Sequence, residues 1–321
     1  MKIGTIALVA LSLCAAAGPA SGQSIGYADA VGQLGTTCGG DIGKYCKGVN
    51  LGGGRLVRCL QQKGEAVSSR CRASMVALGT LLTTREQARA AVPRVCDADI
   101  RRVCAGVQAG DGNLMECFYK ARQNISGPCQ QAVADAGYEV KINASAPTTQ
   151  VALSSTDLIT SLQGVEQAAP ALTAARLRQM AVQGLNDPSR ANRVNRAPLT
   201  DDLDKLAQLT IAIQFDLDSA RIRPDSFKAV GLMADALYHP YLQGYRFLIV
   251  GHTDGRGSRE YNLKLSQQRA DAIRDALINP FGIAPSRLEA VGLGEEQLLR
   301  RANPEAAENR RVQLINVGPV R

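Results

Sequence analysis

The clearest pattern in the chain is a change from strand-like to helix-like spacing of hydrophobic residues near its C-terminal end. Residues 245–250 form a short apolar run, which predicts a buried strand. After a polar loop, apolar residues recur at three- and four-residue steps up to Ile278, which predicts a helix. The loop contains two glycines and ends at Ser258, a favourable helix N-cap. A strand–loop–helix crossing is where α/β domains usually place ligand contacts.

The rest of the C-terminal region continues the alternation of strands and helices. The pattern predicts a helix at 201–208, a strand at 211–215, a helix at 227–238, and strands at 287–291 and 310–317. From the first strand onward the order is β-α-β-α-β-β. This order predicts an α/β two-layer sandwich with its helices on one face of the sheet, within a domain spanning residues 200–321.

Before residue 200 the helical patterns are shorter. We expect an unstructured start at 23–37, and helices at 54–63, 66–78, from Thr84 to about Pro93, at 155–162 and at 171–183. Residues 141–154 are rich in Ser, Ala, Thr and Pro, which is typical of a linker. Residues 186–198 carry three arginines and few apolar residues, and we expect them to be a second, solvated basic linker. The whole segment 141–199 is therefore predicted to be a linker with short helices.

Nine cysteines are present, and all but Cys14 fall into two sets with the same internal spacing of 8, 13 and 12 positions. The sets lie 58 residues apart, which indicates an internal duplication within residues 23–140. The first repeat spans 38–71 and the second spans 96–129. Their members are Cys38, Cys46, Cys59 and Cys71, and then Cys96, Cys104, Cys117 and Cys129.

An even number of cysteines in an exported chain predicts disulfides, although the sequence leaves three pairings open within each repeat. We favour the nested pairing, because Cys46 and Cys59 would face each other across a helical hairpin turning at residues 52–54. A bridge of that size contributes about 3 kcal/mol in the chain-entropy model. Metal or thioredoxin-like redox chemistry is disfavoured because no C-x-x-C pair is present. The spacing, with D-I-x-x-x-C and C-[LF], resembles the cysteine-rich repeat of the Golgi apparatus protein 1 family.

The first 22 residues have the plan of a secretory signal peptide: Lys2, an apolar run at 3–13, and small residues up to a cleavage site before Gln23. Leu13 precedes Cys14, which disfavours a lipoprotein signal and favours simple cleavage. The apolar run is too short to span a bilayer, and we expect no transmembrane segment. The net charge is +8, with the basic excess in residues 23–199. That excess suits anionic envelope polymers or a solvated surface equally well. Nucleic acid is excluded as a partner by the lack of basic clusters with interleaved aromatics.

The residues after the predicted strand form an ordered motif from Thr253 to Ala270, T-D-x-x-G-S-x-x-Y-N-x-x-L-S-x-x-R-A, followed by N-R-R-V at 309–312. This motif resembles the C-terminal peptidoglycan-binding domain of OmpA-like outer-membrane proteins, which peptidoglycan-associated lipoproteins and MotB proteins share. The resemblance covers about residues 211–317. It implies a disulfide-rich α-helical region followed by an OmpA-like domain.

The resemblance also implies a ligand, the meso-diaminopimelate residue of the peptidoglycan stem peptide. The end of that side chain carries an ammonium and a carboxylate, which a carboxylate and a bidentate guanidinium complement. Asp254 and Arg269 align with the family's two key residues. The other motif residues predicted to bind the ligand are Thr253, Asn262, Leu265, Asn309 and Arg310. Since Arg269 would lie about 16 Å along a helix from Ser258, the loop must fold back along that helix.

These features leave several functions open. The leading hypothesis is a non-enzymatic peptidoglycan-binding protein of the periplasm, and a position at the outer membrane is left open. The alternatives are a cell-wall enzyme or an adhesin that the C-terminal domain only targets, with an envelope protein as a partner of the repeats. Asp254 and Arg269 could also form an internal salt bridge. No catalytic set accompanies His252, and Asp216, Asp218 and Asp225 fit turns and caps better than a calcium loop, so we expect no metal and no cofactor.

Overall fold

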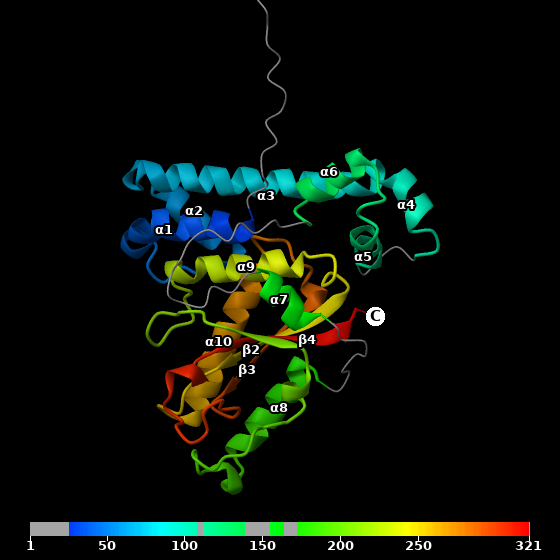
Figure 1. Cartoon of the computed structure of the whole chain (residues 1–321). Coiled ribbons are helices and arrows are strands. Elements are labelled where there is room, and N and C mark those ends of the chain that lie inside the picture. Colours follow the sequence, from blue (N-terminus) through cyan, green and yellow to red (C-terminus); the bar gives the residue numbers. More distant parts are fainter. Residues whose placement is uncertain (1–25, 108–111, 139–154, 164–171, 321) are drawn as a thin grey trace, which may run out of the picture.

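The computed structural model describes residues 26–107, 112–138, 155–163 and 172–320 (Figure 1). The predicted signal peptide and the Ser/Ala/Thr/Pro-rich linker segment lie outside these ranges. Within the described ranges, none of the helices combines the length and the apolar character that crossing a membrane requires.

The C-terminal region forms a four-stranded mixed sheet with the strand order β1-β4-β2-β3. Its strands are β1 (Gln208–Ile211), β2 (Tyr245–His252), β3 (Leu288–Gly294) and β4 (Val312–Pro319). β2 pairs in parallel with β3, and β4 runs antiparallel to both β1 and β2. The predicted β-α-β-α-β-β order is confirmed. The helix predicted at 201–208 is wrong: only a 3-10 turn, Leu203–Lys205, is present, and the first strand starts at Gln208 because its edge pairs with β4.

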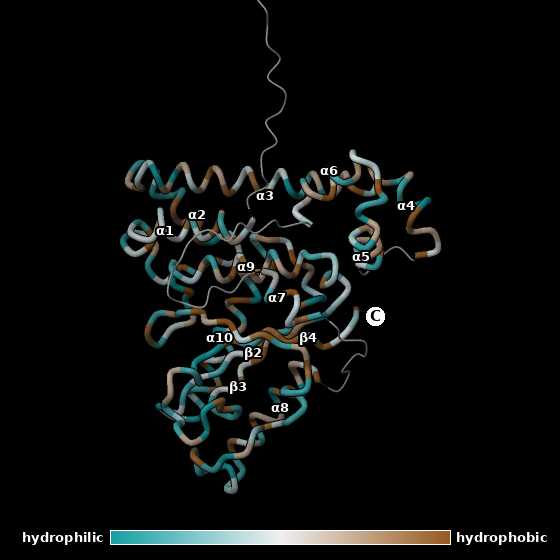
Figure 2. The backbone as a smooth tube through the Cα atoms, viewed as in Figure 1, coloured by the Kyte–Doolittle hydropathy of each residue, from teal (hydrophilic) through white to brown (hydrophobic). Residues whose placement is uncertain are grey.

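Two helices cover one face of this sheet, α9 (Phe227–Leu237) and α10 (Arg259–Ile278). Alternate residues of β2 point to opposite faces, so Phe247 and Ile249 join the core under α9 and α10 while Leu248 and Val250 belong to a second core. The hydrophobic stretches of Figure 2 accordingly include the central strands β2 and β4. α10 begins after Ser258, whose side-chain oxygen accepts a hydrogen bond from the Tyr261 backbone amide at 3.2 Å, as the N-cap prediction requires.

The described parts of the predicted linker, residues 155–163 and 172–199, contain the short helices expected there, and these helices pack on the C-terminal domain. α8 (Ala174–Leu185) covers the second face, with Leu177 and Ala181 against Leu248 and Val250. α7 (Ser155–Leu162) packs against α9 and the β1 edge. The physical reason lies in β2, whose apolar residues face both sides of the sheet and therefore require cover on both. The linker adds a third layer to the predicted two-layer domain (Figure 1).

The first repeat consists of α1 (Tyr27–Tyr45), α2 (Arg55–Gln62) and the start of α3 (Ser69–Val95). The expected unstructured start is wrong, because α1 already begins at Tyr27 and buries Val31 and Leu34. The expected start of a new helix after Thr84 is also wrong, because α3 is one helix of 27 residues that continues through Thr84 and links the two repeats. Pro93 lies in the last turn of that helix and cannot donate the backbone hydrogen bond that the Arg89 carbonyl would otherwise accept.

The second repeat contains the end of α3, then α4 (Asp97–Val103), α5 (Asn113–Lys120) and α6 (Gly127–Asp135). Both repeats carry the nested disulfide pairing that the sequence analysis favoured: Cys38–Cys71, Cys46–Cys59, Cys96–Cys129 and Cys104–Cys117. A second duplicated contact accompanies them. Asp41 accepts hydrogen bonds from the Ser68 amide and hydroxyl, and Asp99 does the same for Ser126. Each of these serines caps the helix that carries the last cysteine of its repeat.

The first repeat and the C-terminal domain share one hydrophobic core, which α1 and α9 build together. The carboxylate of Asp235 on α9 accepts hydrogen bonds from the Tyr27 and Ala28 amides at 2.8 and 2.9 Å, so it caps α1. Gly35 permits the close approach, because a Cβ there would lie 2.2 Å from the Pro224 carbonyl oxygen. The second repeat has a small core of its own around Phe118.

Candidate functional site

The loop between β2 and α10 folds back along the helix, as the sequence analysis required. The Asn262 side-chain amide donates hydrogen bonds to the Asp254 and Arg256 carbonyls and to the Glu295 carboxylate, at 3.2, 2.8 and 2.7 Å. The Gly255 amide donates to the Pro304 carbonyl at 2.8 Å, which ties the loop to the segment before β4. These contacts place Asp254 beside the N-terminal turns of α10.

Asp254 forms an ion pair with Arg310, with Nη1 and Oδ2 2.6 Å apart. Its other oxygen accepts a hydrogen bond from the Arg256 amide at 3.2 Å. The Asp254 side chain is 10% exposed and that of Arg310 is 46% exposed, so the cation lies on the solvent side of the acid. The salt bridge left open by the sequence is therefore present, but its cation is Arg310 and not Arg269.

Arg269 projects from α10 toward the loop that follows β1. Its Nε atom donates to the Ser219 carbonyl at 3.0 Å, and its guanidinium carbon lies 4.9 Å from the centre of the Phe215 ring. Burial lowers the pKa of Arg269, the nearby charge of Arg310 lowers it further, and the charges of Asp218 and Asp254 act in the opposite direction. The charges of Asp254 and Arg310 therefore act on Arg269, although no direct hydrogen bond joins Arg269 to Asp254 in the described part of the chain.

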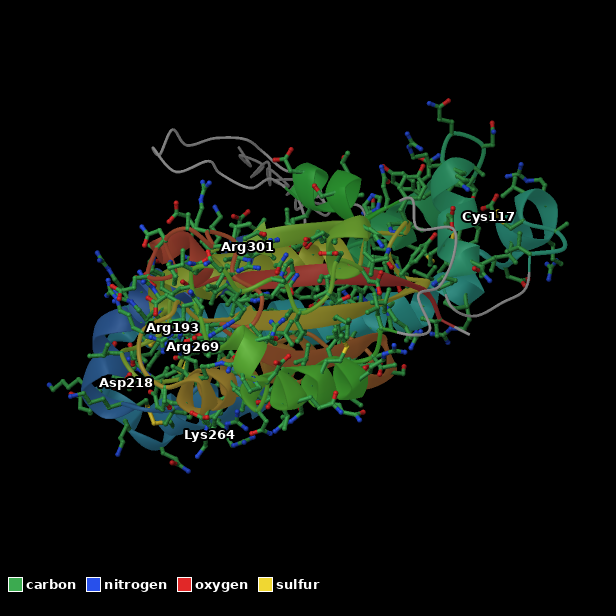
Figure 3. The ribbon with its side chains drawn as sticks, turned by 90° about the horizontal axis from the view of Figure 1, so that it is seen from below. Cys117, Arg193, Asp218, Lys264, Arg269 and Arg301 are labelled. Carbon is green, nitrogen blue, oxygen red and sulfur yellow. A yellow bond between two sulfur atoms is a disulfide. The ribbon has the colours of Figure 1, made fainter. Side chains whose placement is uncertain are left out.

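The loop beside Arg269 also carries Asp218, which the sequence analysis had assigned to a turn. Its carboxylate accepts a hydrogen bond from the Tyr261 hydroxyl at 3.0 Å, and this bond raises the pKa of Tyr261. Asp216 and Asp225 pair with Arg221 and Arg223. The three acids therefore do not converge on a common point, and the described residues hold no cluster suited to a metal ion. Asp218 and Arg269 lie together at the end of the molecule formed by the first repeat, while Cys117 lies at the opposite end (Figure 3).

The remaining predicted ligand residues are buried, and two of them hold loops. Asn309 has no exposed surface, and its side chain accepts from the Arg300 amide and donates to the carbonyls of Asn303 and Pro304. Asn262 holds the Asp254 loop. Thr253 and Leu265 are 4% and 7% exposed. Asp254, Arg269 and Arg310 are thus the charged members of the predicted set, and the other four are buried.

The three arginines of residues 186–198, hereafter the arginine strap, are not a solvated run. Arg190, Arg193 and Arg196 form ion pairs with Glu295 and Glu296, whose side chains are 1% exposed. Two buried carboxylates would be strongly unfavourable without such partners, which explains why the strap packs on the domain. The sequence analysis did not predict these ion pairs, because nothing in the sequence of residues 186–198 indicates which acids they contact.

The strap also contacts the loop between β2 and α10, residues 253–258, hereafter the ligand loop. Nη2 of Arg193 donates to the Gly257 carbonyl at 2.6 Å, while its Nε bonds to Glu295 at 2.9 Å. Glu295 in turn accepts from Asn262, which holds the Asp254 carbonyl. The strap, the buried glutamate and the ligand loop therefore form one hydrogen-bonded assembly.

Comparisons with known proteins identify the family of the C-terminal domain. The model of the OmpA family matches residues 214–311, which include the sheet crossing, Asp254, Arg269 and Arg310. A peptidoglycan-associated lipoprotein of Pseudomonas putida is 34% identical over 132 residues, covering 40% of this chain and 77% of that protein. The chain belongs to the OmpA family. Outer membrane porin F of Pseudomonas aeruginosa is 33% identical over 111 residues, which cover 34% of this chain and 31% of the porin.

Two solved structures are also similar in part to this OmpA-family chain. One is an outer membrane protein from Borrelia burgdorferi, with 28% identity and a TM-score of 0.29, covering 35% of this chain and 88% of that one. The other is a MotB-like protein from Desulfovibrio vulgaris, with 19% identity and a TM-score of 0.31, covering 46% and 97%.

Proposed function

We propose that this chain binds peptidoglycan non-covalently through the meso-diaminopimelate residue of its stem peptide, and so attaches its disulfide-rich module to the cell wall. Membership of the OmpA family, with relatives named peptidoglycan-associated lipoproteins, supports binding to the wall polymer. The observation that carries the choice of ligand is the grouping of one acid, Asp254, with two guanidinium groups, Arg269 and Arg310, at a single site.

The acid has capacity for a ligand. An ionised carboxylate offers about four acceptor positions, and Asp254 uses two of them, for Arg256 and Arg310. Because the Arg310 side chain is nearly half exposed, it can move aside or share the carboxylate when an ammonium arrives. Asp254 then takes the ammonium of diaminopimelate.

The guanidinium of Arg269 complements the other charge. Its Nε is used by the Ser219 carbonyl, and in the described part of the chain its two terminal nitrogens have no hydrogen-bond partner. Two coplanar N–H groups with a fixed stem are the arrangement that binds a carboxylate bidentately. The α-carboxylate of diaminopimelate, on the same carbon as the ammonium, is the group that Arg269 binds.

The function proposed is binding without catalysis. The eight cysteines of the repeats are paired in disulfides, so they offer no thiol nucleophile. His252 is 2% exposed, and burial above all lowers its pKa well below the ordinary value, which suits a packed neutral ring. A protein that binds the wall would act in the periplasm, and relatives named peptidoglycan-associated lipoprotein and outer membrane porin F support a place in the cell envelope.

The test is sedimentation of the purified protein with insoluble peptidoglycan that contains diaminopimelate. We expect the wild type to sediment and Asp254→Ala and Arg269→Ala to remain in the supernatant. Arg301→Ala is the matched control, because Arg301 is exposed and has no ion pair among the described residues. Peptidoglycan with lysine in place of diaminopimelate lacks the second carboxylate and should bind less. Unchanged sedimentation of both site variants would contradict the assignment.

A further inference from the structure

Asn50 of the first cysteine-rich repeat contacts the loop that holds Arg269. Its Nδ2 donates to the Ala220 carbonyl at 2.7 Å, and its Oδ1 accepts from the Ile222 amide at 3.2 Å. The same oxygen accepts from the Leu51 amide at 3.0 Å. Residues 216–222 are hereafter called the Arg269 loop. The Asn50 side chain therefore holds the backbone of this loop with both its donor and its acceptor atom.

The Arg269 loop is the segment that holds two side chains at the mouth of the site. Its Ser219 carbonyl accepts the hydrogen bond from Nε of Arg269, and its Asp218 accepts the one from Tyr261. Asp218 has a φ of 50°, in the left-handed region that a residue with a Cβ rarely adopts. Such a backbone persists only when its surroundings fix it, and Asn50 supplies part of that fixation.

The position of Asn50 depends in turn on a disulfide. Asn50 lies in the stretch closed by Cys46–Cys59, which are 13 residues apart. Gly52 within this stretch packs so closely on α10 that a Cβ would lie 3.0 Å from the Ala276 amide nitrogen. Arg55, in the same stretch, forms an ion pair with Asp275 of α10. The disulfide stretch is thus docked on α10, the helix that carries Arg269.

We propose that Asn50 is a positioning residue for Arg269, and that the first repeat with its Cys46–Cys59 bridge intact is a working part of the peptidoglycan site. This inference rests on the proposed function. It predicts that the affinity for the ligand depends on the oxidation state of one particular disulfide. The duplication supplies an internal control, since Cys104–Cys117 is the equivalent bridge of the second repeat and Cys117 lies at the far end of the molecule from Arg269 (Figure 3).

The experiment titrates the full mature chain with a soluble peptidoglycan fragment carrying meso-diaminopimelate. We expect Asn50→Ala to lower the affinity by about tenfold, a typical strength of coupling between two linked sites. Lys47→Ala, an exposed position of the same disulfide stretch, is the control and should bind as the wild type does. Replacing Cys46 and Cys59 by serine should lower the affinity, and replacing Cys104 and Cys117 should not.

A reciprocal measurement distinguishes a positioning role of Asn50 from a purely structural one. If the intact bridge strengthens ligand binding, the bound ligand must stabilise that bridge by the same factor. At equilibrium in a thiol/disulfide redox buffer, saturating fragment should therefore shift the reduction of Cys46–Cys59 to more reducing conditions and leave Cys104–Cys117 unaffected. Melting curves of each variant show whether the fold is retained.

The outcomes are distinct. If the wild type binds no diaminopimelate fragment, the proposed function fails and this inference fails with it. If the wild type binds and Asn50→Ala binds equally well, only the inference is overturned. Equal loss of affinity on removing either disulfide, or equal protection of both by the ligand, would also overturn it.

Discussion

The Arg310 guanidinium lies 2.6 Å from the Asp254 carboxylate, so the acid at the centre of the site is already paired with a cation. Among the described residues, by contrast, Arg269 donates a hydrogen bond only from its Nε, to the Ser219 carbonyl. The two arginines therefore have different tasks. Arg310 holds the Asp254 side chain in place, and in the proposed complex a ligand ammonium competes with it while Arg269 presents donors to a ligand carboxylate.

A first prediction follows from the shape of the Arg269 head group. Arg269→Lys keeps the positive charge but removes both the planar pair of donors and the contact with Ser219. We expect its affinity for diaminopimelate peptidoglycan to fall by about tenfold or more, as the loss of about 1.5–3 kcal/mol of charge-assisted hydrogen bonding implies. Sedimentation at several peptidoglycan concentrations measures the change. Arg301→Lys should bind normally, and an Arg269→Lys variant that did so too would show that charge alone suffices.

A second prediction concerns the arginine strap. Glu296→Ala leaves Arg190 and Arg259 without their buried carboxylate partner, while Arg196 keeps its pair with Glu295. Breaking a buried ion pair from one side typically costs about 3–5 kcal/mol, so the free energy of unfolding should fall by about that amount. Glu308→Ala removes an exposed partner of Arg300 and should change it by less than about 1 kcal/mol. Urea unfolding of both variants compares the two costs, and similar values would contradict a stabilising role for the strap.

A third prediction uses the unequal setting of the two repeats. Cys38 and Cys71 belong to the core shared with the C-terminal domain, whereas Cys96 and Cys129 belong to the separate core of the second repeat. Removing either bridge should cost about 2–5 kcal/mol. Loss of Cys38–Cys71 should lower the main unfolding transition, and loss of Cys96–Cys129 should produce an earlier, partial transition. Calorimetry distinguishes these results, and a single transition in both variants would mean that the repeats unfold together.

A fourth prediction is a dependence of stability on pH below neutrality. Burial lowers the pKa of His239 to about 4, from an ordinary value of 6.5, so the folded state binds fewer protons there than the unfolded state. The stability from this group is complete above pH 6.5 and is lost as the pH falls toward 4, by at most about 3 kcal/mol. His239→Phe retains ring contacts with Tyr119 and Tyr241 but cannot be protonated. Its melting temperature should fall less between pH 7 and pH 5, and parallel curves would contradict the assignment.

The sequence by itself determined the local features whose causes are local. The apolar run of β2, the cap at Ser258 and the periodic face of α10 each depend on neighbours within one element, and all three are present. The cysteine spacing left three pairings open, and the nested one was favoured because a short helical hairpin brings Cys46 and Cys59 together, a local relationship that the structure confirms.

Only the tertiary structure decided which groups meet across the chain. The partner of Asp254 is 56 residues away and the partners of the strap arginines are about 100 residues away, distances over which no periodicity carries information. The same holds for α1, whose start is helical because Asp235 caps it and α9 covers its apolar side. Hydrogen bonds and ion pairs of this kind are fixed by packing of whole elements, so residue types alone left their partners undetermined.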